Sequence, residues 1–123
     1  MKPQGQPVQK PLLYLCSPYS NPDPSVRQAR FDAACRAAAD LIREGKIIFS
    51  PVAHSHALCQ YDLPLDWEFW QQLDRRFLEA CDEVVVLILD GWRESVGIQA
   101  EMAIAHALGK PVSFLSVGGD SSP

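Results

Sequence analysis

The chain contains the run Val84-Val85-Val86-Leu87-Ile88-Leu89, six apolar residues in succession, most of them β-branched. Strands that are apolar on both faces are typical of parallel sheets covered by helices on each side. Three further short runs have β-strand character, at residues 12–16, 46–49 and 111–115. We therefore predict an α/β domain built on a mainly parallel sheet of about four strands.

Longer segments with helical spacing of apolar residues separate these runs. The first helix is expected from Asp23-Pro24-Ser25 to Gly45, because such residues are common at helix starts and glycine is common after helix ends. A second is expected over 66–80 and a third after Ser95. The inward face of the third helix is expected to carry Ile98, Met102, Ala105 and Leu108. This alternation predicts a small doubly wound domain of three layers, which binds ligands beyond the carboxyl ends of its strands.

Composition bounds the number of domains and the possible partners. The 123 residues suit one soluble domain, which we expect to span residues 12–117, with flexible tails at 1–11 and 118–123. The 11 basic and 15 acidic residues give a net charge of -4, which argues against binding to a nucleic acid polymer. The longest apolar run has six residues, whereas a membrane-spanning helix needs ~20, so no membrane partner is expected.

Several patterns that would indicate a particular chemistry are missing from the sequence. It has no Gly-x-Gly-x-x-Gly, Walker A or Gly-x-Ser-x-Gly motif, which removes the main support for dinucleotide oxidoreductases, P-loop nucleotidases and serine hydrolases. The segment His54-Ser55-His56, with Cys59 nearby, matches none of the usual zinc spacings. We therefore predict no metal site and interpret this segment as a loop that lines a pocket or forms hydrogen bonds.

Cysteine usage and the first residues bear on the cellular compartment. The four cysteines are dispersed, with no Cys-x-x-Cys pair, which is typical of a reduced compartment. The first seven residues lack the apolar stretch of a secretory signal. We therefore expect a cytoplasmic protein.

Two carboxylates interrupt the apolar faces of predicted helices. Asp74 is four residues after Trp70 and three before Phe77, so a helix places it on the same face as these aromatic side chains. Glu101 follows Ile98 by three residues, within the stripe expected to pack on the sheet. Each can be an ordinary edge residue that pairs with an arginine or caps backbone groups.

Together, Asp74 and Glu101 also suit glycosidic chemistry, which leads us to predict that both face one cleft at the carboxyl edge of the sheet. In such chemistry one carboxylate attacks the anomeric carbon and the other handles the proton of the leaving group. The aromatic surroundings of Asp74 are expected to raise its pKa, so that it holds a proton while Glu101 is ionised.

The segment from Asp90 to Ile98 joins a buried strand to the third helix. Ser95 is expected to cap that helix, and Gly97 lies in its first turn. Free backbone N–H groups there can bind an anion, although an ordinary helix start explains the same residues.

The aromatic side chains at Tyr61, Trp67, Phe69 and Trp70 are interpreted as core or subunit interface. We expect a homo-oligomer, because a small sheet leaves its edges uncovered.

Three motifs follow one another along the chain. They are Leu13-Tyr14-Leu15-Cys16-Ser17-Pro18-Tyr19, then Leu73-Asp74 ahead of residues 80–86, then Ser95-Val96-Gly97-Ile98-Gln99-Ala100-Glu101 ahead of residues 107–111. In this order and spacing they resemble the nucleoside 2-deoxyribosyltransferase superfamily, including its deoxynucleoside 5′-monophosphate N-glycosidase branch. The similarity spans about residues 12–116 and extends to small uncharacterised bacterial members, which it resembles most.

The resemblance implies a flavodoxin-like, Rossmann-like fold and cleavage of the bond between a base and a 2-deoxyribose, without a metal or organic cofactor. Glu101 matches the family's nucleophile, Asp74 the aspartate that assists proton transfer to the departing base, and Tyr14 the tyrosine that orients the nucleophile. Ser95 and Gly97 match the turn that cradles the phosphate in the monophosphate branch. The substrate-binding positions that the resemblance implies are Ser17, Tyr19, His54, Ser95 and Gly97.

The sequence departs from the family pattern at several places, two of them single sites in the chain. Met102-Ala103 follows Glu101 where the family commonly has a residue followed by glycine, and Ser20 stands where the monophosphate branch has an arginine. We predict an N-glycosidase or deoxyribosyltransferase that acts on a nucleoside or its 5′-monophosphate through a covalent glycosyl-Glu101 intermediate. The alternatives are a nucleotide-binding or sensing module without turnover, and an interaction domain in which Asp74 and Glu101 are members of structural ion pairs.

Overall fold

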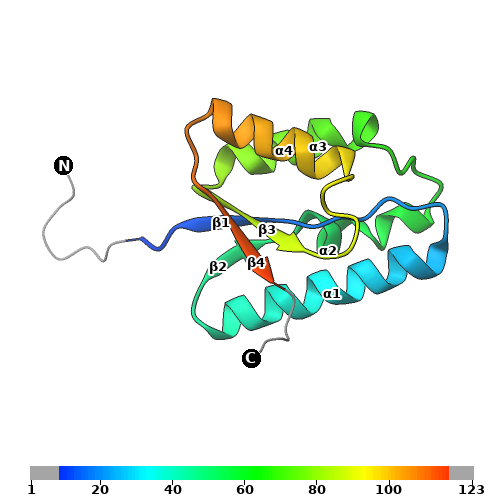
Figure 1. The fold of residues 1–123 in the computed structure, drawn as a ribbon, viewed down its shortest axis with the longest axis horizontal. Helices are drawn as coiled ribbons and strands as arrows, with labels where there is room; N and C mark the ends of the chain where they lie inside the picture. Colours follow the sequence, from blue (N-terminus) through cyan, green and yellow to red (C-terminus); the bar gives the residue numbers. More distant parts are fainter. Residues whose placement is uncertain (1–8, 117–123) are drawn as a thin grey trace, which may run out of the picture.

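A parallel sheet of four strands forms the middle layer of the fold (Figure 1). The structure, a computed structural model, describes residues 9–116, so most of the tails expected at 1–11 and 118–123 lie outside the described residues. The strand order is β2-β1-β3-β4, and every pairing is parallel. The elements in chain order are β1 (Leu12–Cys16), α1 (Pro24–Arg43), β2 (Ile47–Phe49), α2 (Pro51–Ser55), the 3-10 helix η1 (Leu58–Gln60), α3 (Trp67–Ala80), β3 (Glu83–Ile88), α4 (Val96–Ala107) and β4 (Val112–Ser116).

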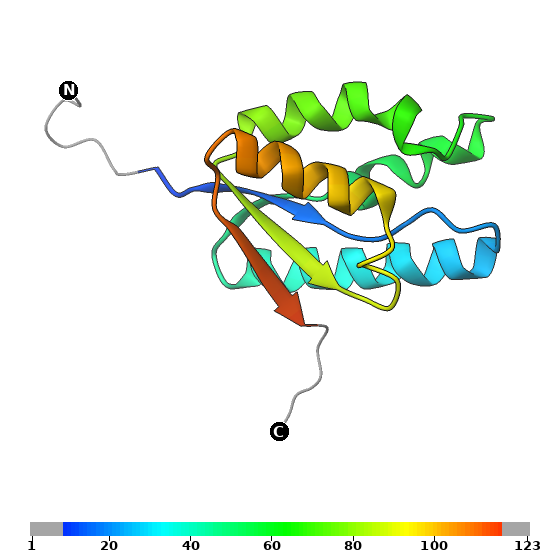
Figure 2. The same cartoon turned by 45° about the horizontal axis from the view of Figure 1, so that its top comes forward.

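Helices cover both faces of this sheet. Figures 1 and 2 show α3 and α4 together on one face and α1 across the other. The predicted three-layer α/β fold around a parallel sheet is therefore confirmed. Within residues 9–116, none of the helices combines the length and apolar character that crossing a membrane requires.

Alternating side chains along β1 and β3 pack on opposite faces of the sheet. One buried cluster, beneath α3 and α4, contains Tyr14, Cys16, Leu78, Cys81, Val84, Val86, Ile98 and Ala105. The other, beneath α1, contains Leu13, Leu15, Leu41, Val85 and Leu87. Because each face needs its own apolar set, both central strands are apolar apart from Glu83 at the start of β3.

The structure agrees with the predicted ends of α1. The Asp23 carboxylate accepts a hydrogen bond from the backbone N–H of Ser25 at 2.9 Å, which caps the first turn. After the helix the chain turns at Gly45, whose φ of +92° lies in the left-handed region that favours glycine. This turn returns the chain to the sheet at β2.

The segment after β2 is helical, whereas the sequence pattern predicts a loop there. The side chain of Ser50 accepts a hydrogen bond from the backbone N–H of Ala53 at 3.1 Å, and Pro51 occupies the first helical position. Serine followed by proline is a favourable helix start, and here it begins the short helix α2. The prediction of a loop around His54 was wrong because Ser50 and Pro51 begin a helix there.

The inward face of α4 differs from the prediction at its last position. Ile98 and Ala105 are buried and Met102 is half-buried, as expected, but Leu108 is 49% exposed. α4 ends at Ala107, so Leu108 no longer follows the helical stripe.

Several large apolar side chains stay exposed on the described surface. They include Phe77, Val96, Leu108 and Phe114, while Trp67, Phe69 and Trp70 are half-buried. The strands β2 and β4 form the two edges of the sheet. Such features are compatible with subunit contacts, and the homo-oligomer stays a prediction.

Replacing Ile98 by alanine is expected to lower the free energy of unfolding by about 2–5 kcal/mol, because it opens a cavity in the core beneath α4. Leu108→Ala is the matched control, since it removes an apolar side chain that is largely exposed; its effect should stay within about 0.5 kcal/mol. Urea unfolding followed by circular dichroism measures both. Equal effects would contradict the packing described for α4.

Candidate active site

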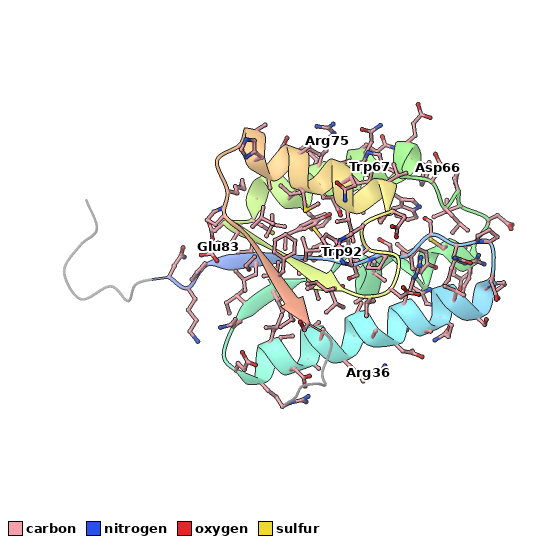
Figure 3. The ribbon with its side chains drawn as sticks, in the orientation of Figure 1. Arg36, Asp66, Trp67, Arg75, Glu83 and Trp92 are labelled. Atoms are coloured by element: carbon pink, nitrogen blue, oxygen red, sulfur yellow. The ribbon has the colours of Figure 1, made fainter. Side chains whose placement is uncertain are left out.

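A cavity of about 700 Å³ opens where the strands end. The segments that follow β1 and β3 form part of its wall, because parallel strands bring their carboxyl ends to one edge of the sheet. The rest comes from α1, α2, η1 and the segment just before α3, and from α3 and α4 as far along as Asp74 and Glu101. Figure 3 shows Asp66 and Trp67, at the start of α3, at this end of the molecule.

Tyr14 and Glu101 form a buried hydrogen bond beside this cavity. The phenol of Tyr14, in the middle of β1, donates to Glu101 Oε2 of α4 at 2.5 Å. Tyr14 is fully buried, and Glu101 is 5% exposed and lines the cavity. Hydrogen bonds from a hydroxyl to a carboxylate are short and strong. The contact therefore holds the Glu101 side chain in one orientation.

The surroundings of Glu101 disfavour its charged form. Its pKa is raised from 4.5 to about 8, mainly because the carboxyl group is buried. The hydrogen bond from Tyr14 lowers this pKa, the charge of Asp74 raises it, and a hydrogen bond from the Cys16 thiol lowers it. Burial and the Glu101 carboxylate also raise the pKa of Tyr14, so its phenol stays a neutral donor.

Asp74 of α3 lies on the wall of the same cavity. It is 9% exposed, and no group among the described residues forms a hydrogen bond with its buried Oδ1 atom. Burial raises the pKa of Asp74 from 3.8 to about 6. A buried carboxylate oxygen without a partner is costly, which suits a site where a ligand supplies one.

The two carboxyl groups differ in pKa, but Glu101 has the higher value, whereas the sequence predicts the higher value for Asp74. A protonated Asp74 beside an ionised Glu101 is expected, whereas the pKa is about 6 for Asp74 and about 8 for Glu101. Glu101 is the more deeply buried, and the charge of Asp74 disfavours a second charge nearby. Between about pH 6 and pH 8 the two groups therefore hold one proton, which the higher pKa places on Glu101.

Four of the predicted substrate-binding positions also line this cavity: Ser17, Tyr19, Ser95 and Gly97. Ser17 follows β1, and no hydrogen bond within the described residues satisfies its buried Oγ atom. Ser95 caps α4, because its Oγ atom accepts a hydrogen bond from the backbone N–H of Ile98 at 3.2 Å. Ser17 Oγ thus joins Asp74 Oδ1 as a buried polar atom without a partner in a residue that lines the cavity.

The structure does not bring His54 to the cavity, in contrast to the prediction. Its exposed ring packs against Phe49 and Phe77, with ring centroids 5.7 Å and 6.0 Å away. His56 lines the cavity instead, because α2 turns the two histidines to different sides. In the part of the chain that the structure describes, no three His, Cys, Asp or Glu side chains are grouped to hold a metal.

Arg30 of α1 also lines the cavity, which no sequence motif indicates. Its guanidinium donates to the carbonyl oxygens of Ser20, at 3.0 Å, and Asp90, at 3.3 Å. A Cβ atom at Gly91 would lie 2.5 Å from Arg30 Nη2, so glycine allows this close approach. Gly91 lies three residues after the end of β3, and its φ of +90° is in the left-handed region that favours glycine. The cavity wall also carries the carboxylates of Asp66, Glu68, Asp74, Glu94 and Glu101.

Residues 11–117 match the family described as Domain of unknown function (DUF1937). The chain belongs to this family. The DUF1937 domain also resembles a solved 2-deoxyribosyltransferase from the psychrotolerant bacterium Bacillus psychrosaccharolyticus, with 23% identity and a TM-score of 0.57 over 90% of this chain and 77% of that chain. This likeness confirms a deoxyribosyltransferase-like fold, while the branch of the superfamily stays a prediction. No curated protein matches the chain.

The raised pKa values predict how the stability of this DUF1937 domain depends on pH. Because Glu101 binds its proton more tightly when folded, the free energy of unfolding should fall as the pH rises from 4.5 to about 8. Each unit of pKa shift corresponds to about 1.4 kcal/mol, so Glu101 alone contributes a loss of a few kcal/mol. Glu101→Gln should remove most of this loss in urea titrations at pH 5 and pH 8.

Glu94→Gln is the matched control, because Glu94 lies on the same wall but is exposed. Its free energy of unfolding should keep the pH dependence of the wild type. If the free energy of unfolding depended on pH in the same way for Glu101→Gln and the wild type, ionising Glu101 would not destabilise the folded protein. That result would contradict the burial described for Glu101.

Proposed function

We propose that this domain is an N-glycosidase or deoxyribosyltransferase, which cleaves the base–sugar bond of a (deoxy)nucleoside or its 5′-monophosphate. The observation that carries the proposal is that Glu101, held by Tyr14, and the unpartnered Asp74 line one cavity. Two carboxyl groups with different pKa values on one pocket suit cleavage through a covalent glycosyl intermediate. The fold shared with a 2-deoxyribosyltransferase supports the same assignment.

In the proposed reaction, the Glu101 carboxylate attacks the anomeric carbon of the sugar. A bond forms between Glu101 oxygen and this carbon while the bond from the carbon to the base nitrogen breaks, and its electron pair goes to the base. Asp74 delivers its proton to the departing base. Water or the nitrogen of a second base then attacks the same carbon, releases Glu101, and returns a proton to Asp74.

This reaction requires the proton of the pair on Asp74, whereas the higher pKa of Glu101 puts it on Glu101 in the empty site. The hydrogen bond from Tyr14 lowers the pKa of Glu101, and the value of about 8 already includes this effect, so the reactive form with the proton on Asp74 is the minor one in the empty site. Trp67 and Trp70 give the cavity an apolar surface, against which a base can pack. The steps use side chains alone, and no metal or organic cofactor takes part.

Replacing Glu101 by glutamine should lower kcat by about three orders of magnitude or more, because the amide keeps the shape but cannot act as the nucleophile. Asp74→Asn should cost about 10²- to 10⁴-fold, the usual contribution of a general acid. A panel of nucleosides and 5′-monophosphates, assayed for free base by chromatography, measures this. Mass spectrometry of wild type quenched during turnover should show a sugar adduct on Glu101.

Glu79→Gln, which changes an exposed carboxylate of α3 outside the cavity lining, is the control in these assays and should retain wild-type activity. The kcat/KM of the wild type should follow a bell-shaped pH profile with limbs near pH 6 and pH 8, because only the singly protonated pair is competent. Wild-type activity in Glu101→Gln would overturn the proposed mechanism. Ligand binding without turnover in the wild type would instead favour a binding or sensing module.

The start of α4 supports the 5′-monophosphate as a substrate. Ser95 Oγ already satisfies the N–H of Ile98, which leaves the first N–H groups of the helix for a ligand. The guanidinium of Arg30 lies beside Gly91 in the loop that leads into α4, and can compensate for Ser20 at the family's arginine position. These groups oppose the repulsion between a phosphate and the carboxylates on the same wall.

A 5′-monophosphate should therefore bind roughly tenfold more tightly than its nucleoside, in line with one or two charge-assisted hydrogen bonds. Ser95→Ala and Arg30→Gln should each reduce that ratio, because each weakens the proposed phosphate site. Calorimetric titration of both ligands into Glu101→Gln protein measures the ratio without turnover. If Glu101→Gln protein bound the nucleoside and its 5′-monophosphate with equal affinity, the phosphate site would be excluded and a nucleoside substrate favoured.

A further inference from the structure

A chain of four polar side chains leads from the surface of α1 to the cavity. Gln28 Nε2 lies 3.1 Å from Asp32 Oδ1, and Gln28 Oε1 lies 3.2 Å from Nε2 of His56. On the other side of the imidazole ring, Nδ1 lies 2.7 Å from the phenol oxygen of Tyr19. Tyr19 and His56 line the cavity, so the chain ends at the ligand site.

The direction of each hydrogen bond in this chain follows from Asp32. An ionised carboxylate only accepts, so the amide nitrogen of Gln28 donates to it and the amide oxygen faces His56. That oxygen only accepts, so Nε2 of the imidazole carries the hydrogen. In a neutral imidazole the other nitrogen is then an acceptor, and Tyr19 donates its hydroxyl hydrogen to it.

Packing holds the imidazole of His56 in place for these hydrogen bonds. The ring of Phe31 stacks on His56 with centroids 4.2 Å apart and planes 20° apart. The ring of Tyr19 meets the imidazole edge-on, at 5.5 Å and 81°. Because Gln28, Phe31 and Asp32 occupy successive turns of α1, that one helix both orients the imidazole and selects its tautomer.

Two further groups face the phenol of Tyr19. Burial raises the pKa of Tyr19, the Cys59 thiol raises it further, and the Arg27 guanidinium lowers it, with a net increase. The phenol therefore stays neutral at physiological pH. Since a guanidinium only donates, Arg27 also favours the orientation in which the hydroxyl hydrogen points away from it, as the bond to His56 requires.

We infer that Tyr19 acts toward the ligand as a hydrogen-bond acceptor, with His56, Gln28 and Asp32 as the positioning residues that set this polarity. The inference rests on the proposed function, which makes the ligand a nucleoside or its monophosphate. With its hydrogen used by His56, Tyr19 can only accept a hydrogen bond from a ligand in the cavity. It selects a ligand hydroxyl or amine at the point of contact and disfavours a carbonyl, an ether or a phosphate oxygen there.

The tautomer of His56 can be measured without any ligand. The ¹⁵N chemical shifts of histidine-labelled protein above the titration of His56 should show its hydrogen on Nε2. Gln28→Leu removes the acceptor at Nε2 and should shift the ring toward a mixture of tautomers. Gln71→Leu, a glutamine of α3 outside this chain, is the matched control and should leave the spectrum of His56 unchanged. A hydrogen on Nδ1 in the wild type would overturn the inference.

The consequence for ligands is tested with 2′-deoxyadenosine and three analogues, which lack the exocyclic amine, the 3′-hydroxyl or the 5′-hydroxyl. In the Glu101→Gln background, one analogue should bind roughly tenfold more weakly than 2′-deoxyadenosine, because it lacks the group that donates a hydrogen bond to Tyr19. That difference should vanish when Tyr19→Phe is added. If Tyr19→Phe weakens all four ligands equally, Tyr19 has only a structural role and the inference fails.

The two experiments separate this inference from the proposed function. Turnover of nucleosides together with His56 hydrogen on Nδ1 would overturn the inference and leave the proposed function intact. An absence of binding by all four ligands would contradict the nucleoside part of both, while the ¹⁵N spectra would still decide the polarity of Tyr19.

Discussion

The hydrogen bond between Tyr14 and Glu101 is the contact on which the arrangement of this site depends. It joins the central strand β1 to α4 across the interior, at 2.5 Å. A buried carboxyl group is costly unless it is hydrogen-bonded or protonated, and here both conditions contribute. Tyr14 can serve because it sits in the middle of the sheet, where its ring packs with the apolar cluster beneath α3 and α4. The same position that buries the phenol also makes it a neutral donor.

The parallel sheet explains why the other polar groups meet this pair. All four strands end at one edge, so the residues after β1 and β3 and the starts of α3 and α4 surround one cavity. Asp74 and Ser17 each present a buried oxygen there without a partner in the described residues. Their burial raises the cost of an empty site, and a ligand that satisfies these atoms recovers part of it.

α1 contributes to the cavity from the opposite face of the sheet. Arg30 links the segments after β1 and β3 through backbone carbonyls, and the turn carrying Gln28 and Asp32 orients His56. These contacts join residues far apart in the sequence, so no periodicity or spacing predicts them. These side chains of α1 reach the cavity from a helix whose own residues form no recognisable motif.

The sequence by itself determined the strands, the three long helices and the buried positions of Asp74 and Glu101, because alternation, helical spacing and capping residues are local signals. Long-range packing decided which side chains share the cavity. It separated His56 from His54 through the short helix α2 and brought Arg30 beside Gly91. It also reversed the expected order of the two pKa values, because burial depth and the distance between charges depend on contacts between helices rather than on neighbours in the chain.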